Sequence, residues 1–126
     1  MGFDWVEYLN LAQELAGPTK TPADQEARQR SAISRAYYAA FCQSRNYLRD
    51  KEGHSLPSGG QVHAYVQEQF KQSPDPLRSQ IGHHLNRLRL DRNRADYDDS
   101  VQDVDKMCVR DMLLAQRVLA ALNDIA

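Results

Sequence analysis

Apolar residues recur with a helical period along nearly the whole chain, and this periodicity most constrains the fold. The first run sets the pattern, with apolar side chains at Trp5, Tyr8, Leu9, Ala12, Leu15 and Ala16 before Gly17 and Pro18 stop it. No strand-like alternation, internal repeat or low-complexity tract interrupts the pattern. The sequence therefore predicts an all-α fold, an antiparallel up-and-down bundle of four to five helices, in a single domain over residues 1–126.

Capping residues mark the breaks between the predicted helices. Thr21, followed by Pro22, opens a long second helix that extends to about Asp50. The other predicted starts are the capping-box pair Ser58 and Gln61, the pair Asp75 and Pro76, and Ser100 with Asp103 three residues later. The last of these helices is expected to extend through Ile125.

The charge and cysteine content limit the possible classes of function. The 126 residues carry a formal net charge of −1, so any contact with nucleic acid must be local rather than a global electrostatic attraction. Cys42 and Cys108 lie in helical patterns without zinc-site spacing, and we interpret them as buried thiols in a reducing compartment. Asp4 and Glu7 interrupt any signal-peptide core, and no apolar run is long enough to span a membrane. We therefore expect a soluble, cytoplasmic protein.

The second helix has more apolar surface than one core face can use. Its main stripe comprises Ile33, Tyr37, Ala40, Phe41, Ser44 and Leu48, whereas the opposite side carries Ala32, Tyr38, Ala39 and Cys42, interrupted mainly by Arg35. A helix with two apolar sides lies at the centre of its fold or is buried against a second subunit. Both explanations are open, and small residues beside an aromatic residue and an arginine favour a homodimer.

The segment from Leu85 to Ser100 reverses its charge within a few residues. Arginines at 87, 89, 92 and 94 run into Asp96, Tyr97, Asp98 and Asp99. Favourable interactions with the dipoles of two helix ends explain much of this pattern, and capping explains the aspartates better than a cation site does. The pattern therefore predicts the end of one helix and the approach to the next.

Arg92 requires a separate explanation. If the helix continues at about 100° per residue, Arg92 falls on the apolar stripe of Ile81, Leu85 and Leu88. A buried arginine needs an anionic partner or a ligand. The candidate partners are Asp96, four residues later, and Asp111, which lies on the apolar stripe of the last helix. Arg35 could equally serve Asp111 or a partner subunit.

Two motifs resemble one known superfamily. The segment RSAISRAYYAAFCQSRNYL (Arg30 to Leu48), followed by LRLDRNRADYDDS (Leu88 to Ser100), is similar to the HEPN (higher eukaryotes and prokaryotes nucleotide-binding) superfamily, especially its small stand-alone bacterial and archaeal members. The resemblance implies an all-α bundle, commonly a homodimer with a cleft between subunits. It also implies metal-independent ribonucleases or toxins of toxin–antitoxin pairs, often encoded beside a minimal nucleotidyltransferase.

The catalytic signature of that superfamily is only half present. It consists of an arginine, usually followed by a polar residue such as Asn, and a histidine that is separated from the arginine by four to six residues. Arg92 and Asn93 match the first half, but Tyr97 stands five residues after Arg92 and no histidine follows His84. A tyrosine is a poor general base at neutral pH because its ordinary pKa is near 10.

Other histidines offer no convincing substitute for the missing one. Arg78 with His83 or His84 satisfies the bare spacing, but it lies mid-helix, before the turn where the superfamily places its site. The ordinary interpretation is that Arg78 and His83 face solvent and that His84 lies near the apolar stripe. His54 and His63 are isolated, without metal-ligand spacing, and we predict neither a metal nor a cofactor.

These residues lead to two functional hypotheses and a third, weaker one. The first is binding of RNA or a nucleotide phosphate by Arg92 and Asn93, helped by Arg89 and by stacking on Tyr97, with Asp96, Asp111 and Arg35 supporting the site. The second is a non-catalytic interaction module that dimerises and docks a nucleotidyltransferase or a toxin–antitoxin partner. The third is a metal-independent endoribonuclease with rearranged chemistry. The sequence assigns no catalytic residue.

Overall fold

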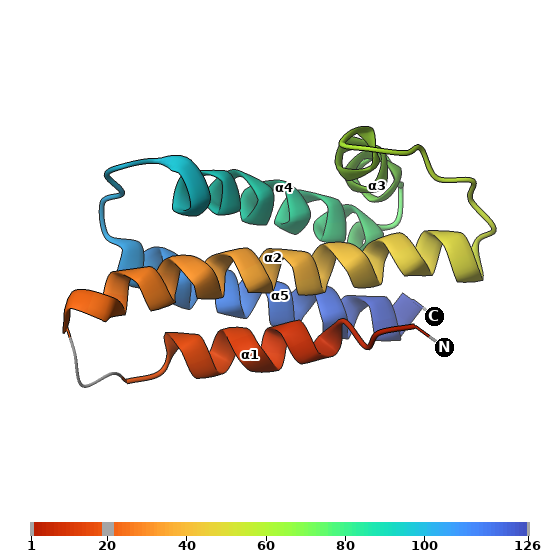
Figure 1. Ribbon diagram of the computed structural model, residues 1–126. Coiled ribbons are helices and arrows are strands. Elements are labelled where there is room, and N and C mark those ends of the chain that lie inside the picture. The colour runs from red at the N-terminus through yellow and green to blue at the C-terminus, as the bar shows by residue number, and fades with distance from the viewer. Residues whose placement is uncertain (1, 19–21, 126) are drawn as a thin grey trace.

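The computed structural model describes residues 2–18 and 22–125 and contains five helices over these residues. They are α1 (Val6–Ala16), α2 (Pro22–Lys51), α3 (Gln61–Lys71), α4 (Pro76–Tyr97) and α5 (Val104–Ile125). The four helices α1, α2, α4 and α5 lie lengthwise, and each runs opposite to the preceding one of the four (Figure 1). The predicted all-α bundle is confirmed. The short helix α3 crosses beside the start of α4 and is seen end-on in Figure 1.

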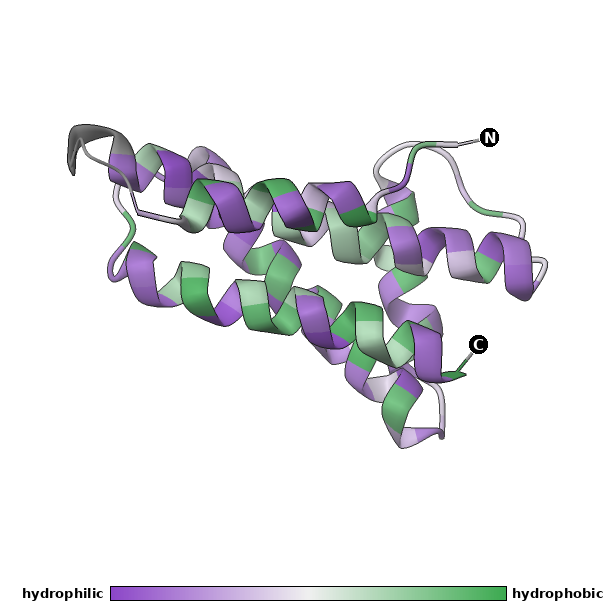
Figure 2. Cartoon of the chain, turned by 90° about the horizontal axis from the view of Figure 1, so that it is seen from below, coloured by the Kyte–Doolittle hydropathy of each residue, from purple (hydrophilic) through white to green (hydrophobic). Residues whose placement is uncertain are grey.

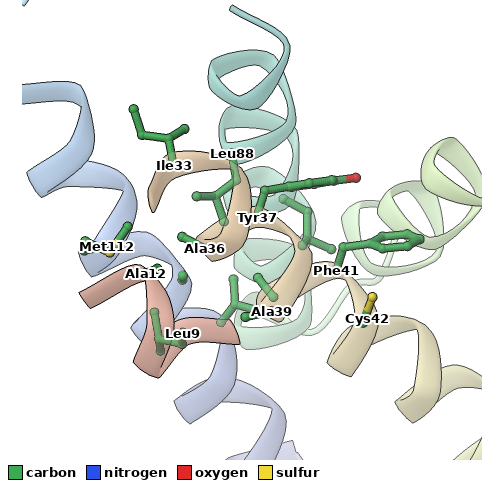
Figure 3. Packing of buried hydrophobic residues seen from close by; sticks show 14 of the residues in the cluster. Leu9, Ala12, Ile33, Ala36, Tyr37, Ala39, Phe41, Cys42, Leu88 and Met112 are labelled. Carbon is green, nitrogen blue, oxygen red and sulfur yellow. The ribbon is translucent and has the colours of Figure 1, made fainter. Parts of the chain in front are cut away.

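The long helix α2 is the central element, since it packs against all four other helices. Ala32, Ala36 and Ala39 on its second apolar side are completely buried. Leu9 and Ala12 of α1 lie beside this side (Figure 3). The two apolar sides of α2 are therefore accounted for within one chain. The homodimer stays a prediction, and the two apolar sides of α2 no longer support it.

The amphipathic pattern places the core between the helices. Apolar and polar bands alternate along each helix (Figure 2), as expected when one stripe packs inward and the other faces solvent. The largest completely buried apolar side chains include Tyr37, Phe70, Ile33, Leu48 and Ile81. Both predicted buried thiols, Cys42 and Cys108, are confirmed as buried and free. No helix in the described residues combines the length and apolarity that a membrane span requires.

One glycine sets how closely α3 approaches α4. Gly82 of α4 is buried, and a Cβ atom built on it would overlap the backbone nitrogen and Cα of Lys71 at the end of α3. Only a residue without a side chain permits this approach. Gly82 therefore helps to position α3 across the bundle.

The predicted helix starts are partly right. Asp75 is extended, and its carboxylate accepts a hydrogen bond of 3.2 Å from the backbone N–H of Arg78, which confirms the predicted cap. The second helix begins at Pro22 as predicted, while its predicted cap Thr21 lies outside the described residues.

Two other predicted starts are wrong for one physical reason. Instead of a capping box at Ser58, α3 begins at Gln61 behind Gly60, which makes no side-chain cap. Instead of starting after Ser100, α5 begins at Val104. Gly59 has a φ of 70° and Asp103 a φ of 52°. A residue with positive φ does not continue a right-handed helix, so each helix starts after it.

Candidate functional site

Arg92 lies on the inward side of α4 and faces α2. Its guanidinium carbon is 5.4 Å from the ring centres of both Tyr37 and Tyr38, and its side chain is only 13% exposed. The predicted inward direction is therefore confirmed. The arginine-rich segment is not a turn, because α4 continues to Tyr97. This continuation carries Arg92 onto the helix face that meets α2.

The ion pair between Arg92 and Asp96 is long. A carboxylate oxygen of Asp96 lies 3.8 Å from one guanidinium nitrogen, and the same oxygen accepts a hydrogen bond of 3.3 Å from the Ser34 hydroxyl. The Nε of Arg92 is buried and has no hydrogen-bond partner in the described part of the chain. The long contact to Asp96 leaves most of the donor capacity of Arg92 unused.

Arginines and aromatic rings alternate from α1 across α2 to α4. Arg35 lies 4.8 Å from the ring centre of Tyr8 and 5.4 Å from that of Tyr38, so Tyr38 contacts both Arg35 and Arg92. Arg45 lies 5.5 Å from the Trp5 ring centre. Guanidinium groups over aromatic faces are held by cation–π attraction. We define the cation–aromatic cluster as Trp5, Tyr8, Arg35, Tyr37, Tyr38, Phe41, Arg45, His63, Arg89 and Arg92.

His63, near the start of α3, joins this cluster. Its Nδ1 is 2.5 Å from the Tyr37 hydroxyl, and its ring stacks on Phe41 with the ring centres 4.2 Å apart. Tyr37 and Phe41 both extend from α2 toward α3 (Figure 3). From the sequence, His63 is predicted to be isolated from other site residues. No spacing signal could have found it, since the contact joins residues on two helices whose crossing is set by tertiary packing.

The charges around His63 fix its protonation. Burial lowers its pKa first, and the positive charges of Arg89, Arg92 and Arg45 lower it further. Burial also raises the pKa of the Tyr37 hydroxyl well above its usual range. At neutral pH the tyrosine therefore keeps its proton and the imidazole is neutral. The direction of the hydrogen bond between them follows the imidazole tautomer. In the tautomer whose Nδ1 accepts from Tyr37, the ring proton is on Nε2, and this nitrogen is a hydrogen-bond donor.

The arginines of the cluster have fewer close anionic partners than the other arginines. Arg30, Arg49, Arg78 and Arg110 each have a carboxylate oxygen within 3.1 Å, whereas Arg87 and Arg94 have one only at 3.8 and 4.0 Å. Among the described side chains, those of residues 2–18 and 25–125, the ion pair from Arg92 to Asp96 at 3.8 Å is the only one made by an arginine of the cluster. Arg45 instead bonds the side-chain oxygen of Asn46 at 3.0 Å. The cluster therefore concentrates positive charge that the fold does not neutralise.

The structure brings together only part of the predicted binding set. The positive charges of Arg89 and Arg92 both favour a lower pKa of Tyr37 and of His63, so both arginines lie near these two groups. Tyr97 is 76% exposed at the end of α4, and no contact in the described residues links it to the cluster. Asn93 is half-buried and makes no side-chain hydrogen bond within residues 2–18 and 22–125. Arg35, predicted as a supporting residue, lies in the cluster.

Asp111 is buried as the apolar stripe predicted, but it pairs with neither Arg92 nor Arg35. It lies 3.7 Å from the Nε of Arg110, whose terminal nitrogen is 2.5 Å from Asp91. Both aspartate side chains are completely buried. Burial, a hydrogen bond with Asp91 and the charge of Asp91 raise the pKa of Asp111 to about 8. Asp91 was missed, although its spacing from the buried Leu88 and Ala95 marks the stripe.

The upstream arginine and histidine pattern does not form a site. Arg78 donates hydrogen bonds to both carboxylate oxygens of Glu52, at 2.7 and 3.1 Å. The expectation that Arg78 faces bulk solvent is therefore wrong. His83 is exposed, and His84 is half-buried. Among the side chains that the structure describes, those of residues 2–18 and 25–125, no three from His, Cys, Asp or Glu gather as a metal ion would require.

Fold and site together define a helical-bundle domain with a positively charged cation–aromatic cluster between α1, α2, α3 and α4. Comparison with known proteins found no family model, curated protein or solved structure that matches the chain. The HEPN resemblance therefore depends on the two sequence motifs alone.

Proposed function

We propose that this chain binds RNA or a nucleotide through phosphate contacts of Arg89 and Arg92. The observation that carries the proposal is the cation–aromatic cluster, whose four arginines make one long ion pair with the side chains that the structure describes. Guanidinium groups bind phosphate through two parallel hydrogen bonds, and an uncompensated group of them attracts an anion. A net charge of −1 for the chain confines this attraction to the cluster.

His63 fits a role in binding. In the tautomer whose Nδ1 accepts from Tyr37, the neutral imidazole presents a donor at Nε2, and a phosphate oxygen accepts such a bond. In this tautomer neither nitrogen offers a lone pair for proton abstraction. We therefore propose binding without cleavage, in keeping with the half-present catalytic signature of the superfamily that the chain resembles.

The test measures the affinity of a fluorescently labelled single-stranded RNA by anisotropy over a range of salt concentrations. Arg89→Ala should weaken binding and reduce the salt dependence by about 0.7 in the logarithmic slope, because one phosphate contact is lost. Arg94→Ala is the matched control, since Arg94 lies on the same helix, 46% exposed and 4.0 Å from Asp98. This control variant should bind like the unsubstituted protein.

Two results would overturn this proposal. One is the absence of salt-sensitive RNA binding by the folded protein. The other is an equal loss of affinity in both variants, which would indicate a diffuse charge effect. Arg92→Gln is a further variant, whose melting temperature must be compared with that of the unsubstituted protein because Arg92 packs on Tyr37 and Tyr38.

A separate surface favours the second candidate, an interaction module. Val109 and Leu113, one turn apart on α5, are 73% and 45% exposed. They line a surface hollow of about 420 Å³ together with Gln29, Asp105, Lys106 and Arg110. Exposed apolar side chains next to charged ones are typical of protein contact sites, including a homodimer or a nucleotidyltransferase partner. Sedimentation of the purified protein tests self-association, which Val109→Asp should abolish if this face forms the dimer.

A further inference from the structure

A groove opens within the cation–aromatic cluster, between α1, α2 and the start of α3. It has a volume of about 420 Å³ and is lined by Trp5, Tyr8, Arg35, Tyr38, Phe41, Cys42, Arg45, Val62 and His63. This volume lies within the range of small-molecule sites. None of its lining residues belongs to the binding set predicted from the sequence except Arg35.

The walls of the groove combine flat aromatic faces with positive charge. Trp5, Tyr8 and Tyr38 are half-buried, so their rings are partly accessible from the groove. Arg35 and Arg45 lie against these rings, at 4.8 Å from Tyr8 and 5.5 Å from Trp5. Flat rings and guanidinium planes are the surfaces on which unpaired bases stack. An aliphatic ligand would not stack on the rings, and the two arginines would repel a cationic one.

We infer that this groove binds an unpaired base of a nucleotide or of single-stranded RNA. The phosphate of that nucleotide is bound by Arg89 and Arg92. The inference rests on the proposed function and adds its selectivity for single strands. Tyr38 lies between the groove and the phosphate contacts, because it touches both Arg35 and Arg92. In a duplex the bases are paired and stacked inside the helix, so they do not reach such a groove.

The single tryptophan of the chain gives a direct readout, because Trp5 lines the groove. The experiment titrates the full chain with a short single-stranded oligouridylate and with a duplex RNA of the same length, and follows tryptophan fluorescence. A base stacked in the groove quenches this fluorescence. Labelled forms of both RNAs give the affinities by anisotropy.

The variants separate the groove from other aromatic surfaces. Tyr38→Leu should weaken single-strand binding by about tenfold, the loss typical of one stacking platform. Val62→Phe fills the groove without removing a binding group, and it should weaken single-strand binding as well. Tyr97→Leu tests the stacking ring that the sequence predicts at the end of α4, which is 76% exposed outside the groove. Tyr65→Leu is the matched control, since this ring lies beside His54 and does not line the groove. Circular dichroism and melting establish that each variant is folded.

Each outcome decides the inference. Quenching by the single strand, weaker duplex binding and losses in Tyr38→Leu and Val62→Phe support it. Equal affinity for both RNAs without quenching overturns the inference about the groove. If Arg89→Ala still weakens this binding, the proposed phosphate contacts remain intact. Loss of affinity in Tyr97→Leu alone places the stacking at the end of α4 and overturns the groove as well. If no RNA binds to the folded protein, both the inference and the proposed function fail.

Discussion

The buried carboxyl pair between α4 and α5 predicts an unusual dependence of stability on pH. A terminal nitrogen of Arg110 lies 2.5 Å from a carboxylate oxygen of Asp91. Within the described residues, both oxygens of Asp111 and Oδ1 of Asp91 have no hydrogen-bond partner. A proton on one oxygen of Asp111, donated to Oδ1 of Asp91, gives two of these three atoms a partner. This arrangement is why the pKa of Asp111 rises to about 8.

The sign of the effect follows from where the proton is released. Folded Asp111 keeps its proton up to about pH 8, whereas the unfolded chain loses it near the ordinary value of 3.8. Unfolding between these values releases a proton, so a rise in pH favours the unfolded state. Stability therefore falls by about 1.4 kcal/mol per pH unit in this window and levels off above it. From about pH 5 to pH 8 the loss amounts to about 4 kcal/mol.

The perturbation is Asp111→Asn, and the assay is urea unfolding at a series of pH values. Asparagine has similar size, still donates a hydrogen bond to Asp91 and does not titrate. The variant should lose the pH dependence and exceed the unsubstituted protein in stability at the alkaline end by a few kcal/mol. His63 and His84 have lowered pKa values, so they reduce stability as pH falls below about 6.5. The difference between the two proteins cancels this opposite contribution.

One result would refute the reasoning. If the unfolding free energy of the unsubstituted protein does not fall toward pH 8, and Asp111→Asn is less stable at every pH, Asp111 is ionised and pairs with Arg110. Arg110→Gln provides an independent check. Removing the guanidinium leaves the carboxyl pair without its cation, so the pKa of Asp111 should rise further and the fall in stability should extend to higher pH.

The remaining predictions concern backbone and packing. Gly82→Ala should destabilise the protein by about 1–3 kcal/mol in urea unfolding because the added methyl group overlaps α3. Gly60→Ala should stabilise the protein by about 0.5–1 kcal/mol, because Gly60 has a helical φ of −65° and its added methyl group points into open space. Equal effects of these two substitutions would contradict the close helix approach. Asp75→Ala should cost about 1 kcal/mol through the lost cap, and an unchanged melting temperature would argue against it. Cys42 and Cys108 are buried and have raised pKa values, so a thiol reagent should label them only after unfolding, and fast labelling of native protein would disprove this packing.

The sequence predicted the helices well because helical periodicity and caps are local properties. Asp75 shows this directly, since a short polar side chain before Pro76 is sufficient to define a helix start. The starts assigned to Ser58 and Ser100 failed because the sign of φ at Gly59 and Asp103 depends on the turn as a whole. Such backbone reversals leave little trace in the pattern of caps.

The site was predictable where it depends on position along one helix. Arg92 was expected to point inward because it shares the stripe of Leu88, and it does. His63 escaped prediction because its contact with Tyr37 requires α3 to cross the bundle, an arrangement that depends on Gly82. The partner of Asp111 was missed for a related reason, since an aspartate pair sharing one proton differs from the ion pairs that charge patterns predict.

The carboxyl pair and the cation–aromatic cluster are coupled through the rotation of α4 about its axis. Asp91 and Arg92 are adjacent, so their side chains point about 100° apart and reach different helices. Arg110 fixes Asp91 against α5, and Ser34 fixes Asp96 against α2 one turn after Arg92. These two contacts hold α4 at the angle that directs Arg92 over Tyr37 and Tyr38. The polar groups buried on α4 therefore have a common structural consequence, because they determine where the arginines of the cluster lie.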